Sequence, residues 1–380
     1  MFNKIMIGSI ALFFSVLIFF ISCEKQKIVW KETEEGYVII YNPEKPVPPA
    51  GHSSRLVLKQ DLVIGNQTEN EEYMFSDLRS VKIDEEENIY VLDWKEIKIK
   101  VFDKNGNHIR TFGTRGQGPG EMVMPVRMEM APGNRLVIHD LTGAKLIFYS
   151  LDGTCLKEIP TGKFWSMFGF KCDTKGYIYG DTRIYGEKMT AELKKFDSDL
   201  KPISTIASFE DRGVPNIIQP FPTRFSFNVT RDDNIIWLIS SRYELTVVNS
   251  EGKTIKKILK DYKPVKITDR IKERLIKEEF GNRGIPTGRT FEVPSHFPPV
   301  YYFITDDEGR IFVCTLEYED VDGTYCLYYD VFDVEGRYIA RFSHPRREMV
   351  FVAKKNKIYC LVRESEEGIP LVKRYSIIWE

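Results

Sequence analysis

Apolar and polar residues alternate along Asn88–Glu121 in a way that predicts three consecutive β-strands. Ile89–Val91 is a β-prone run, and within Ile97–Val101 the apolar residues alternate with lysines, as in a strand with one buried face. Asn105-Gly106 predicts a tight turn because both residue types tolerate a positive φ. We therefore expect strands two to four of a small antiparallel sheet, followed by the exit loop Gly113–Glu121.

This pattern occurs six times along the chain. The first marker of each copy is an aliphatic residue followed by a β-prone one: Ile89-Tyr90, Leu136-Val137, Ile178-Tyr179, Ile236-Trp237, Ile311-Phe312 and Ile358-Tyr359. A second marker, an aromatic or aliphatic residue before a small polar one, follows each time: Phe102-Asp103, Tyr149-Ser150, Phe196-Asp197, Val248-Asn249, Phe332-Asp333 and Tyr375-Ser376. Such periods are typical of a β-propeller. The sequence therefore predicts an all-β fold, a six-bladed β-propeller of four-stranded antiparallel blades.

The two ends of the propeller are predicted to meet in the last blade. The sixth copy reaches only its third strand before Glu380, and the apolar segment Arg55–Ile64 precedes the first copy without a partner of its own. We expect this N-terminal strand to close the last blade, which would protect the edges of the ring. The propeller would then span 53–380.

One segment departs from the strand pattern. Apolar residues three or four positions apart predict a short helical insertion over about 267–280, with Thr268-Asp269 at its start and Gly281 at its end. The rest of this insertion is rich in proline and glycine, so we interpret it as a loop and not as a second domain.

The first 22 residues have the features of an export signal. Lys4 gives a short positive segment, and the apolar run Ile5–Ile21 ends at Ser22-Cys23, which resembles a bacterial lipoprotein signal. We expect a lipoprotein-type signal peptide over 1–22, lipidation of Cys23, and a proline-rich tether over 23–52. The alternative is an uncleaved anchor, since this run of 17 residues is just long enough to span a bilayer. Both interpretations place the remainder outside the cytoplasm.

Composition limits the partners and the redox chemistry. Hydrophobic residues make up 42% of the chain and the formal net charge is −1, so a packed core is expected and a basic surface for nucleic acid is not. Five cysteines follow Cys23, and none has zinc-site spacing. A hairpin centred near Asp320 would bring Cys314 opposite Cys326, within reach of a disulfide. The alternative is that all five are buried thiols.

Loop length predicts which face of the ring carries a site. In a four-stranded meander, the turns between strands one and two and between strands three and four emerge on one face, which we call the short-turn face. The other connections emerge on the opposite face and include every long segment, for example Gly113–Met124 and Arg363–Pro370. We call this the long-loop face and expect binding residues there.

Arginine and aromatic residues gather in segments that should reach the long-loop face. Arg79, Arg127 and Arg224 lie near the starts of the innermost strands of blades one, two and four. Further candidates from connecting loops are Trp94, Arg115, Gln117, His139, Trp165, Arg183, Arg242 and Tyr243. Arginine binds carboxylates and phosphates through paired N–H groups, so these residues predict a mouth for an acidic or polar ligand. The alternative is that the arginines pair with Asp93, Asp140 and Asp181 and only stabilise the ring.

Patterns typical of catalysis are weak. His139 and Asp140 are adjacent in a predicted strand, so their side chains point to opposite faces. The five histidines show no local metal spacing, and the glycine-rich Gly113–Gly120 lacks the lysine and following helix of a P-loop. The sequence therefore favours a non-enzymatic protein without a cofactor.

A family resemblance agrees with this fold. The export signal, Asn88–Val91, Val101–Gly106 and especially Phe112–Glu121 resemble the bacterial six-bladed β-propeller lipoproteins, which are relatives of the NHL and TolB-like propellers. The resemblance covers 53–380 and is sharpest in blade one. It implies an envelope location, periplasmic or associated with the outer membrane, and a ligand-binding or protein-binding role, and it supplies no catalytic motif.

Two functional hypotheses follow from the sequence. The first is a monomeric, envelope-anchored binding protein whose long-loop face takes a protein, peptide or glycan ligand. The second is a metal-dependent propeller hydrolase or lyase, similar to gluconolactonases or amidating lyases, with Ca²⁺ or another divalent ion held by carboxylates or His139. Metal analysis would separate the two. A purely structural scaffold, which would bind no small molecule, is a third interpretation.

Overall fold

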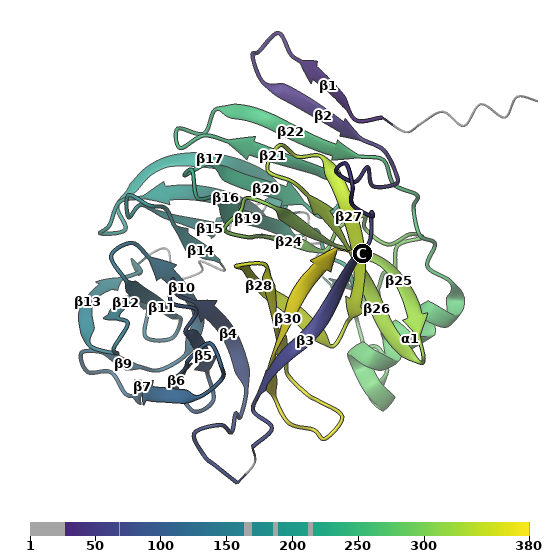
Figure 1. The fold of residues 1–380 in the computed structure, drawn as a ribbon. Coiled ribbons are helices and arrows are strands. Elements are labelled where there is room, and N and C mark those ends of the chain that lie inside the picture. The colour runs from purple at the N-terminus through teal and green to yellow at the C-terminus, as the bar shows by residue number, and fades with distance from the viewer. Residues whose placement is uncertain (1–26, 68, 163–168, 185–188, 212–215, 380) are drawn as a thin grey trace, which may run out of the picture.

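The computed structural model describes residues 27–67, 69–162, 169–184, 189–211 and 216–379. Six antiparallel sheets surround a central axis (Figure 1). Blades one to three consist of β4 (Leu78–Ile83), β5 (Ile89–Asp93), β6 (Lys98–Phe102), β7 (His108–Phe112); β10 (Pro125–Ala131), β11 (Arg135–Asp140), β12 (Lys145–Ser150), β13 (Cys155–Pro160); and β14 (Phe170–Cys172), β15 (Ile178–Ile184), β16 (Met189–Phe196), β17 (Pro202–Asp211). Blades four to six consist of β19 (Phe225–Val229), β20 (Ile235–Ile239), β21 (Glu244–Val248), β22 (Thr254–Lys260); β24 (Tyr302–Thr305), β25 (Ile311–Val321), β26 (Thr324–Phe332), β27 (Tyr338–Pro345); and β28 (Glu348–Lys354), β29 (Lys357–Val362), β30 (Leu371–Trp379), β3 (Leu56–Ile64). The predicted six-bladed β-propeller is confirmed.

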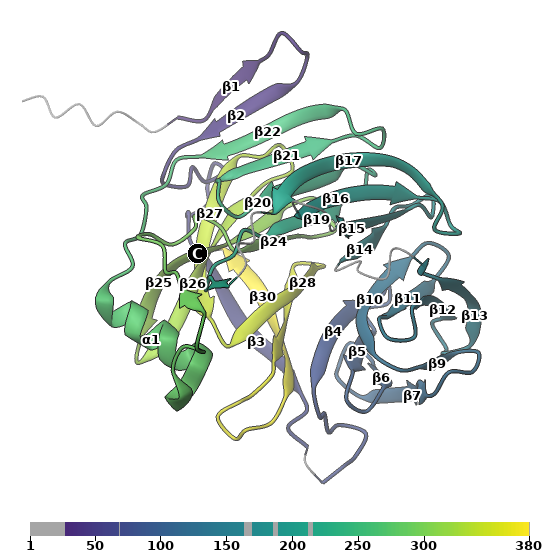
Figure 2. The ribbon, with the colours of Figure 1, turned by 180° about the vertical axis from the view of Figure 1, so that it is seen from behind.

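The first strand of each blade is the innermost one. β4, β10, β14, β19, β24 and β28 contact one another in this order, and β28 contacts β4 to complete the circle. Figure 2, the view from behind, shows fourth strands such as β7 and β13 at the rim. The wall of the central channel is therefore built by six first strands, and their side chains decide what the channel can bind.

The sequence markers coincide with buried positions in the second and third strands. Ile89 in β5 and Phe102 in β6 are fully buried, and so are their counterparts Ile178 and Phe196 in blade three. Burial of these side chains between neighbouring sheets supplies most of the apolar contact that holds the blades together. The repeat is thus a repeat of core positions.

The polar residue after the second marker holds the turn that follows it. Asp103 Oδ1 accepts hydrogen bonds from the backbone N–H groups of Asn105 and Asn107, each at 2.8 Å. Gly106 closes this turn with a φ of 86°, a conformation that favours glycine. The third copy of the repeat lacks this glycine, and Leu200 adopts a φ of 59° there instead. The turn geometry is therefore kept even where its usual residue is missing.

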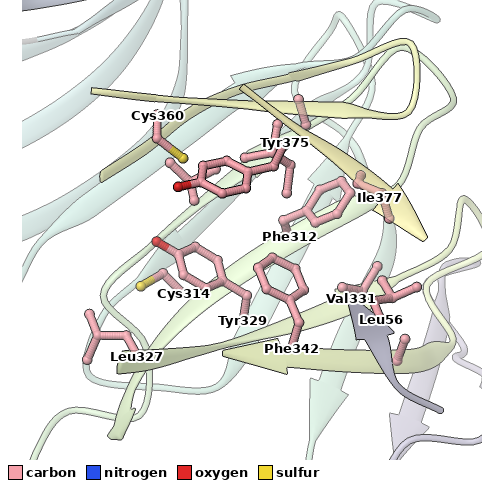
Figure 3. Close-up of a cluster of buried hydrophobic side chains, with 14 of the residues drawn as sticks. Leu56, Phe312, Cys314, Leu327, Tyr329, Val331, Phe342, Cys360, Tyr375 and Ile377 are labelled. Carbon is pink, nitrogen blue, oxygen red and sulfur yellow. The ribbon is translucent and has the colours of Figure 1, made fainter. Parts of the chain in front are cut away.

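The N-terminal strand closes the ring. β3 pairs antiparallel with β30, from Leu56 opposite Trp379 to Ile64 opposite Val372. Leu56 joins a buried cluster of rings of blade five and side chains of β30, in which Tyr329 stacks on Phe342 (Figure 3). The expected completion of the last blade by the segment before blade one is confirmed.

Part of the expected tether is structured, which differs from the prediction for 23–52. β1 (Val29–Glu32) and β2 (Val38–Asn42) form a hairpin, and β2 runs parallel to β22, so the sheet of blade four has six strands. Asn42 is buried, and its Oδ1 accepts a 2.8 Å hydrogen bond from the N–H of Tyr338 in blade five. The hairpin thus bridges the outer edges of two blades. Its parallel pairing with a strand more than two hundred residues away has no local signal in the sequence.

The helical insertion is present as predicted. α1 (Asp269–Phe280) begins after Thr268 and is followed by a 3₁₀ turn at Gly281–Arg283. Its buried face packs against the side of blade five. Two short parallel pairs lie in other connections: β8 (Thr114–Arg115) with β9 (Glu121–Met122), and β18 (Ile217–Ile218) with β23 (Thr290–Phe291). Within the ranges that the structure describes, no helix is long and apolar enough to cross a membrane.

Cys314 and Cys326 are free thiols, so the disulfide considered above does not form. The β25–β26 hairpin turns at Asp322-Gly323, whereas a disulfide between the two cysteines required a turn centred near Asp320. A bulge between Cys314 and Tyr318 shifts the register a second time. As a result, Cys314 lies opposite Tyr329 and Cys326 lies opposite Glu319. Both thiols are buried, and burial raises the pKa of Cys314 to about 12. They act as small apolar side chains in the core.

Candidate functional site at the channel mouth

Buried carboxylates anchor the backbone around the channel mouth on the long-loop face. Asp93 ends β5 and Asp140 ends β11, and both are fully buried. Asp93 accepts a 2.6 Å hydrogen bond from the N–H of Ser76, and Asp140 accepts 2.9 and 2.7 Å hydrogen bonds from those of Val123 and Met124. These carboxylates therefore fix the segments that lead into the first strands of blades one and two.

Two of the predicted arginines stack on aromatic rings at the mouth. Arg79 on β4 pairs with Asp77 at 3.5 Å, not with Asp93, and lies over Trp94, 4.7 Å from the ring centroid. Arg224 precedes β19 and lies 5.2 Å from the ring centroid of Tyr301. Such stacking leaves the edges of the guanidinium free to donate hydrogen bonds in the ring plane.

Arg127 on β10 stands among further positive charges. Part of its side chain is accessible to solvent, but the guanidinium group is surrounded closely enough by protein to lower its pKa. Burial is the largest cause, Asp181 acts in the opposite direction, and Arg363 and Arg79 lower the pKa further. Arg79 and Arg363 thus both repel the guanidinium group of Arg127, and a bound anion would relieve this repulsion.

Asp181 on β15 is the acidic neighbour of this arginine group. It is buried, and burial raises the pKa of its carboxyl to about 7, although the N–H of Gly169, Arg183 and Arg127 act in the opposite direction. The charge of the mouth therefore depends on pH near neutrality. Protonation of Asp181 below this pKa removes a negative charge and makes the mouth more positive.

The structure adds Arg363, which sequence reasoning missed, to this group. The loop Arg363–Pro370 was assigned to the long-loop face, but its first residue was not singled out. Arg363 follows β29 directly, as Trp94 follows β5 in blade one. This equivalence in the repeat was the available signal.

Two candidates that were grouped with the connecting loops lie in strands, and for His139 this agrees with the strand predicted for His139 and Asp140. Arg183 belongs to β15, and His139 belongs to β11. His139 is fully buried and lies edge-on to Phe170, with 6.4 Å between ring centroids. Neither of its ring nitrogens has a hydrogen-bond partner in the described part of the chain, and burial lowers its pKa to about 4. His139 is therefore a neutral core residue and does not line the mouth.

Tyr243, another predicted contact, is buried between blades four and five. Its hydroxyl donates to the fully buried Asp330, which also lies 3.4 Å from Lys260 and 2.6 Å from Arg341. Burial would raise the pKa of Asp330, but Lys260 and Arg341 keep it below its usual value. Tyr243 thus belongs to an ion network that joins two blades.

The remaining candidates are exposed loop residues or lie outside the described residues. Arg115 and Gln117 are exposed in the exit loop of blade one, where Arg115 donates a 3.0 Å hydrogen bond to the carbonyl of Lys95. Arg242 is exposed beside Tyr243. Trp165 and Cys23 fall outside the described ranges. Among the residues that are described, no three His, Cys, Asp or Glu side chains are grouped as metal ligands.

The fold and the channel define a six-bladed β-propeller with an arginine-lined mouth. Residues 64–285 match the DUF5128 family, described as a 6-bladed beta-propeller, and the chain belongs to this family. No curated protein matches the sequence.

Two solved structures have the same overall fold. A predicted exported protein of Bacteroides fragilis is 14% identical over 90% of this chain and 99% of its own, with a TM-score of 0.54. A member of the DUF4221 family from Bacteroides vulgatus is 11% identical over 86% of this chain and 99% of its own, with a TM-score of 0.52. At these identities the likeness shows the fold alone.

Proposed function

We propose that this protein is a non-enzymatic, envelope-anchored binding propeller whose channel mouth on the long-loop face captures an anionic group of a protein, peptide or glycan. The observation that carries the proposal is the group formed by Arg79, Arg127 and Arg363, in which burial and then the neighbouring positive charges lower the pKa of Arg127. Asp93 and Asp140 accept hydrogen bonds from backbone N–H groups of the mouth. The monomer would use its lipidated Cys23 to reach the membrane.

A charge-matched pair of triple variants tests the site. Arg79→Ala/Arg127→Ala/Arg363→Ala removes the arginine group, and Arg274→Ala/Arg337→Ala/Arg346→Ala removes the same charge from exposed ion pairs outside the channel. Binding of the full-length chain to poly-glutamate and to polygalacturonate is measured by calorimetry. We expect the first variant to lose about tenfold or more in affinity for at least one of the two probes and the second to bind like wild type, because surface pairs contribute little.

The outcomes separate the ligand classes. Preference for poly-glutamate indicates a peptide or protein ligand, and preference for polygalacturonate indicates a glycan. Equal affinity of the wild type and the first triple variant would remove the mouth as the binding site. Thermal unfolding of both variants serves as the check on folding.

The location is tested separately. The apolar run before Cys23 and its likeness to a lipoprotein signal support an anchor in the cell envelope. In an expressing bacterium, wild type should incorporate labelled fatty acid and lose residues 1–22, whereas the variant Cys23→Ala should do neither. A wild-type chain that takes up no label and keeps its first 22 residues would favour an uncleaved anchor.

A further inference from the structure

The central channel ends in a cavity on the short-turn face, opposite the arginine mouth. Its volume is about 410 Å³, which is within the range of small-molecule sites. The walls are the last residues of all six first strands and the turns after them, including Ile83, Glu85 and Lys354. The cavity is therefore a pocket on the axis of the ring, distinct from the site of the proposed function.

Three ionisable side chains from neighbouring blades meet in this cavity. Lys82 on β4 places its Nζ 2.8 Å from each carboxylate oxygen of Glu129 on β10. Lys171 on β14 places its Nζ 2.7 Å from Oε2 of the same carboxylate. The side chains of Lys82 and Glu129 are only 11% and 14% exposed, whereas that of Lys171 is 27% exposed. Solvent from the cavity thus reaches Lys171 most easily.

This group carries one more positive than negative charge. Two ammonium groups share one carboxylate, and an uncompensated charge away from bulk water is unfavourable. The pKa of Lys82 is lowered to about 8, chiefly by burial and, despite the attraction of Glu129, further by Lys171. A second anion next to the two lysines would compensate the excess charge.

The other charges that line the cavity do not supply that anion, because the two acids Glu85 and Asp306 are paired and Asp307 is balanced in number by Arg231. Glu85 lies 2.9 Å from Lys354 at the rim, and Asp306 lies 2.6 Å from Arg310. Asp307 accepts a 2.9 Å hydrogen bond from the backbone N–H of Lys355. These acids already have partners at the opening, so the excess charge remains in the interior.

Hydrogen-bond donors are also available in the interior. An ammonium has three N–H donors, and Lys171 uses one of them within the described residues. Across the cavity, Asn228 Nδ2 donates to Thr305 Oγ1 at 2.7 Å, so the hydroxyl hydrogen of Thr305 can point to a ligand. Phe351 and Val352 give the wall an apolar part. The cavity combines a cationic side with a polar and an apolar side.

We propose that this cavity binds a small organic carboxylate, whose carboxylate lies against Lys82 and Lys171 and whose polar body contacts Asn228 and Thr305. A single excess charge suits a carboxylate better than a dianionic phosphate. The side chains of the first strands fix the lysines in place, so the site is formed before the ligand arrives. The ligand enters from the short-turn face and does not compete with a ligand at the arginine mouth.

The test measures binding of glucuronate, malate and citrate to the full-length chain by calorimetry, with glucose as the uncharged counterpart of glucuronate and inorganic phosphate as a competing anion. We expect at least one carboxylate to bind, and glucose not to bind. Lys171→Gln should weaken carboxylate binding about tenfold or more, whereas Lys171→Arg should retain it. Lys82 and Glu129 remain paired in the glutamine variant, so its fold should persist.

A second variant should change the affinity for the carboxylate in the opposite direction. Glu129→Gln removes the internal carboxylate and should tighten carboxylate binding, because the ligand then becomes the only anion beside two lysines. The arginine-mouth triple variant should bind the carboxylate like wild type. The proposal for the cavity and the proposal for the arginine mouth can therefore be refuted independently of each other. The proposal is overturned if no carboxylate of the panel binds, if phosphate binds more tightly than every carboxylate, or if Lys171→Gln leaves carboxylate affinity unchanged.

Discussion

Arg374 on β30 donates a 2.6 Å hydrogen bond to Asp61 on β3, across a sequence separation of 313 residues. The same guanidinium reaches the carbonyl of Lys104 in blade one. These bonds connect the last blade with the closing strand and with blade one, where the two ends of the propeller pair.

Removal of this carboxylate should loosen the closure. In Asp61→Ala, Arg374, whose side chain is 10% exposed, loses its charged partner, and we expect a loss of roughly 1–3 kcal/mol in the free energy of unfolding. Urea unfolding followed by tryptophan fluorescence measures the change. The control Asp199→Ala breaks an exposed pair with Lys157 and should alter stability by less than about 0.5 kcal/mol. Equal effects of the two substitutions would contradict the role of Asp61 in closure.

Asp140 should be among the least replaceable residues of blade two. It is fully buried and accepts hydrogen bonds from the N–H groups of Val123, Met124 and Gly143. Asp140→Ala leaves these donors unsatisfied and should cost roughly 3 kcal/mol or more, whereas Asp140→Asn keeps one acceptor oxygen and should cost less. Amide hydrogen exchange at Val123 and Met124 should rise more in the alanine variant. Unchanged exchange in both variants would show that the carboxylate does not hold this segment.

The repeat could be predicted because it consists of core positions. The repeat positions of Ile89 and Phe102 hold buried residues in every blade, and the short turns between strands have strong local signals. Hairpin register was harder to predict, as Cys314 and Cys326 show, because a bulge shifts the pairing of β25 by two residues without any marked change in composition.

The sites could be predicted only in part. Bulges in the first strands of blades one and two reset the alternation, so the inward-facing residues cannot be counted from the sequence. Lys82, Glu129 and Lys171 lie in separate strands, and each resembles an ordinary polar strand residue until the ring brings them together. The arginines were found because they start the first strands, where the long-loop face begins.

Glu129 should make stability depend on pH in the acid range. Burial alone would raise the pKa of Glu129, but Lys171 and Lys82 lower it from 4.5 to about 2 in the folded chain. The unfolded chain therefore takes up the proton first, and the stabilisation by this carboxylate is complete above pH 4.5 and is lost as the pH falls towards 2.

The variant Glu129→Gln tests this dependence. At neutral pH it leaves two lysines without their carboxylate and should destabilise the fold by roughly 3–5 kcal/mol. The difference in unfolding free energy between wild type and variant should shrink steadily below pH 4.5. Glu348→Gln should show a similar trend, because Glu348 also has its pKa lowered to about 2, by His344, Lys373 and Tyr375 against the effect of burial. A difference that stays constant from neutral to acid pH would contradict the lowered pKa of Glu129.

Replacement of His139, unlike that of Glu129, should be tolerated by the fold. It is neutral in the folded chain because burial lowers its pKa from 6.5 to about 4, so the unfolded state gains a proton first and stability falls as the pH drops from 6.5 to 4. His139→Leu should unfold at the same or a higher temperature than wild type at neutral pH, and its advantage should grow across this window. Circular dichroism melts at several pH values measure both effects. If Ca²⁺ or Zn²⁺ raised the melting temperature of wild type but not of His139→Leu, His139 would be a metal ligand, and the metal-dependent hydrolase or lyase would become the better hypothesis.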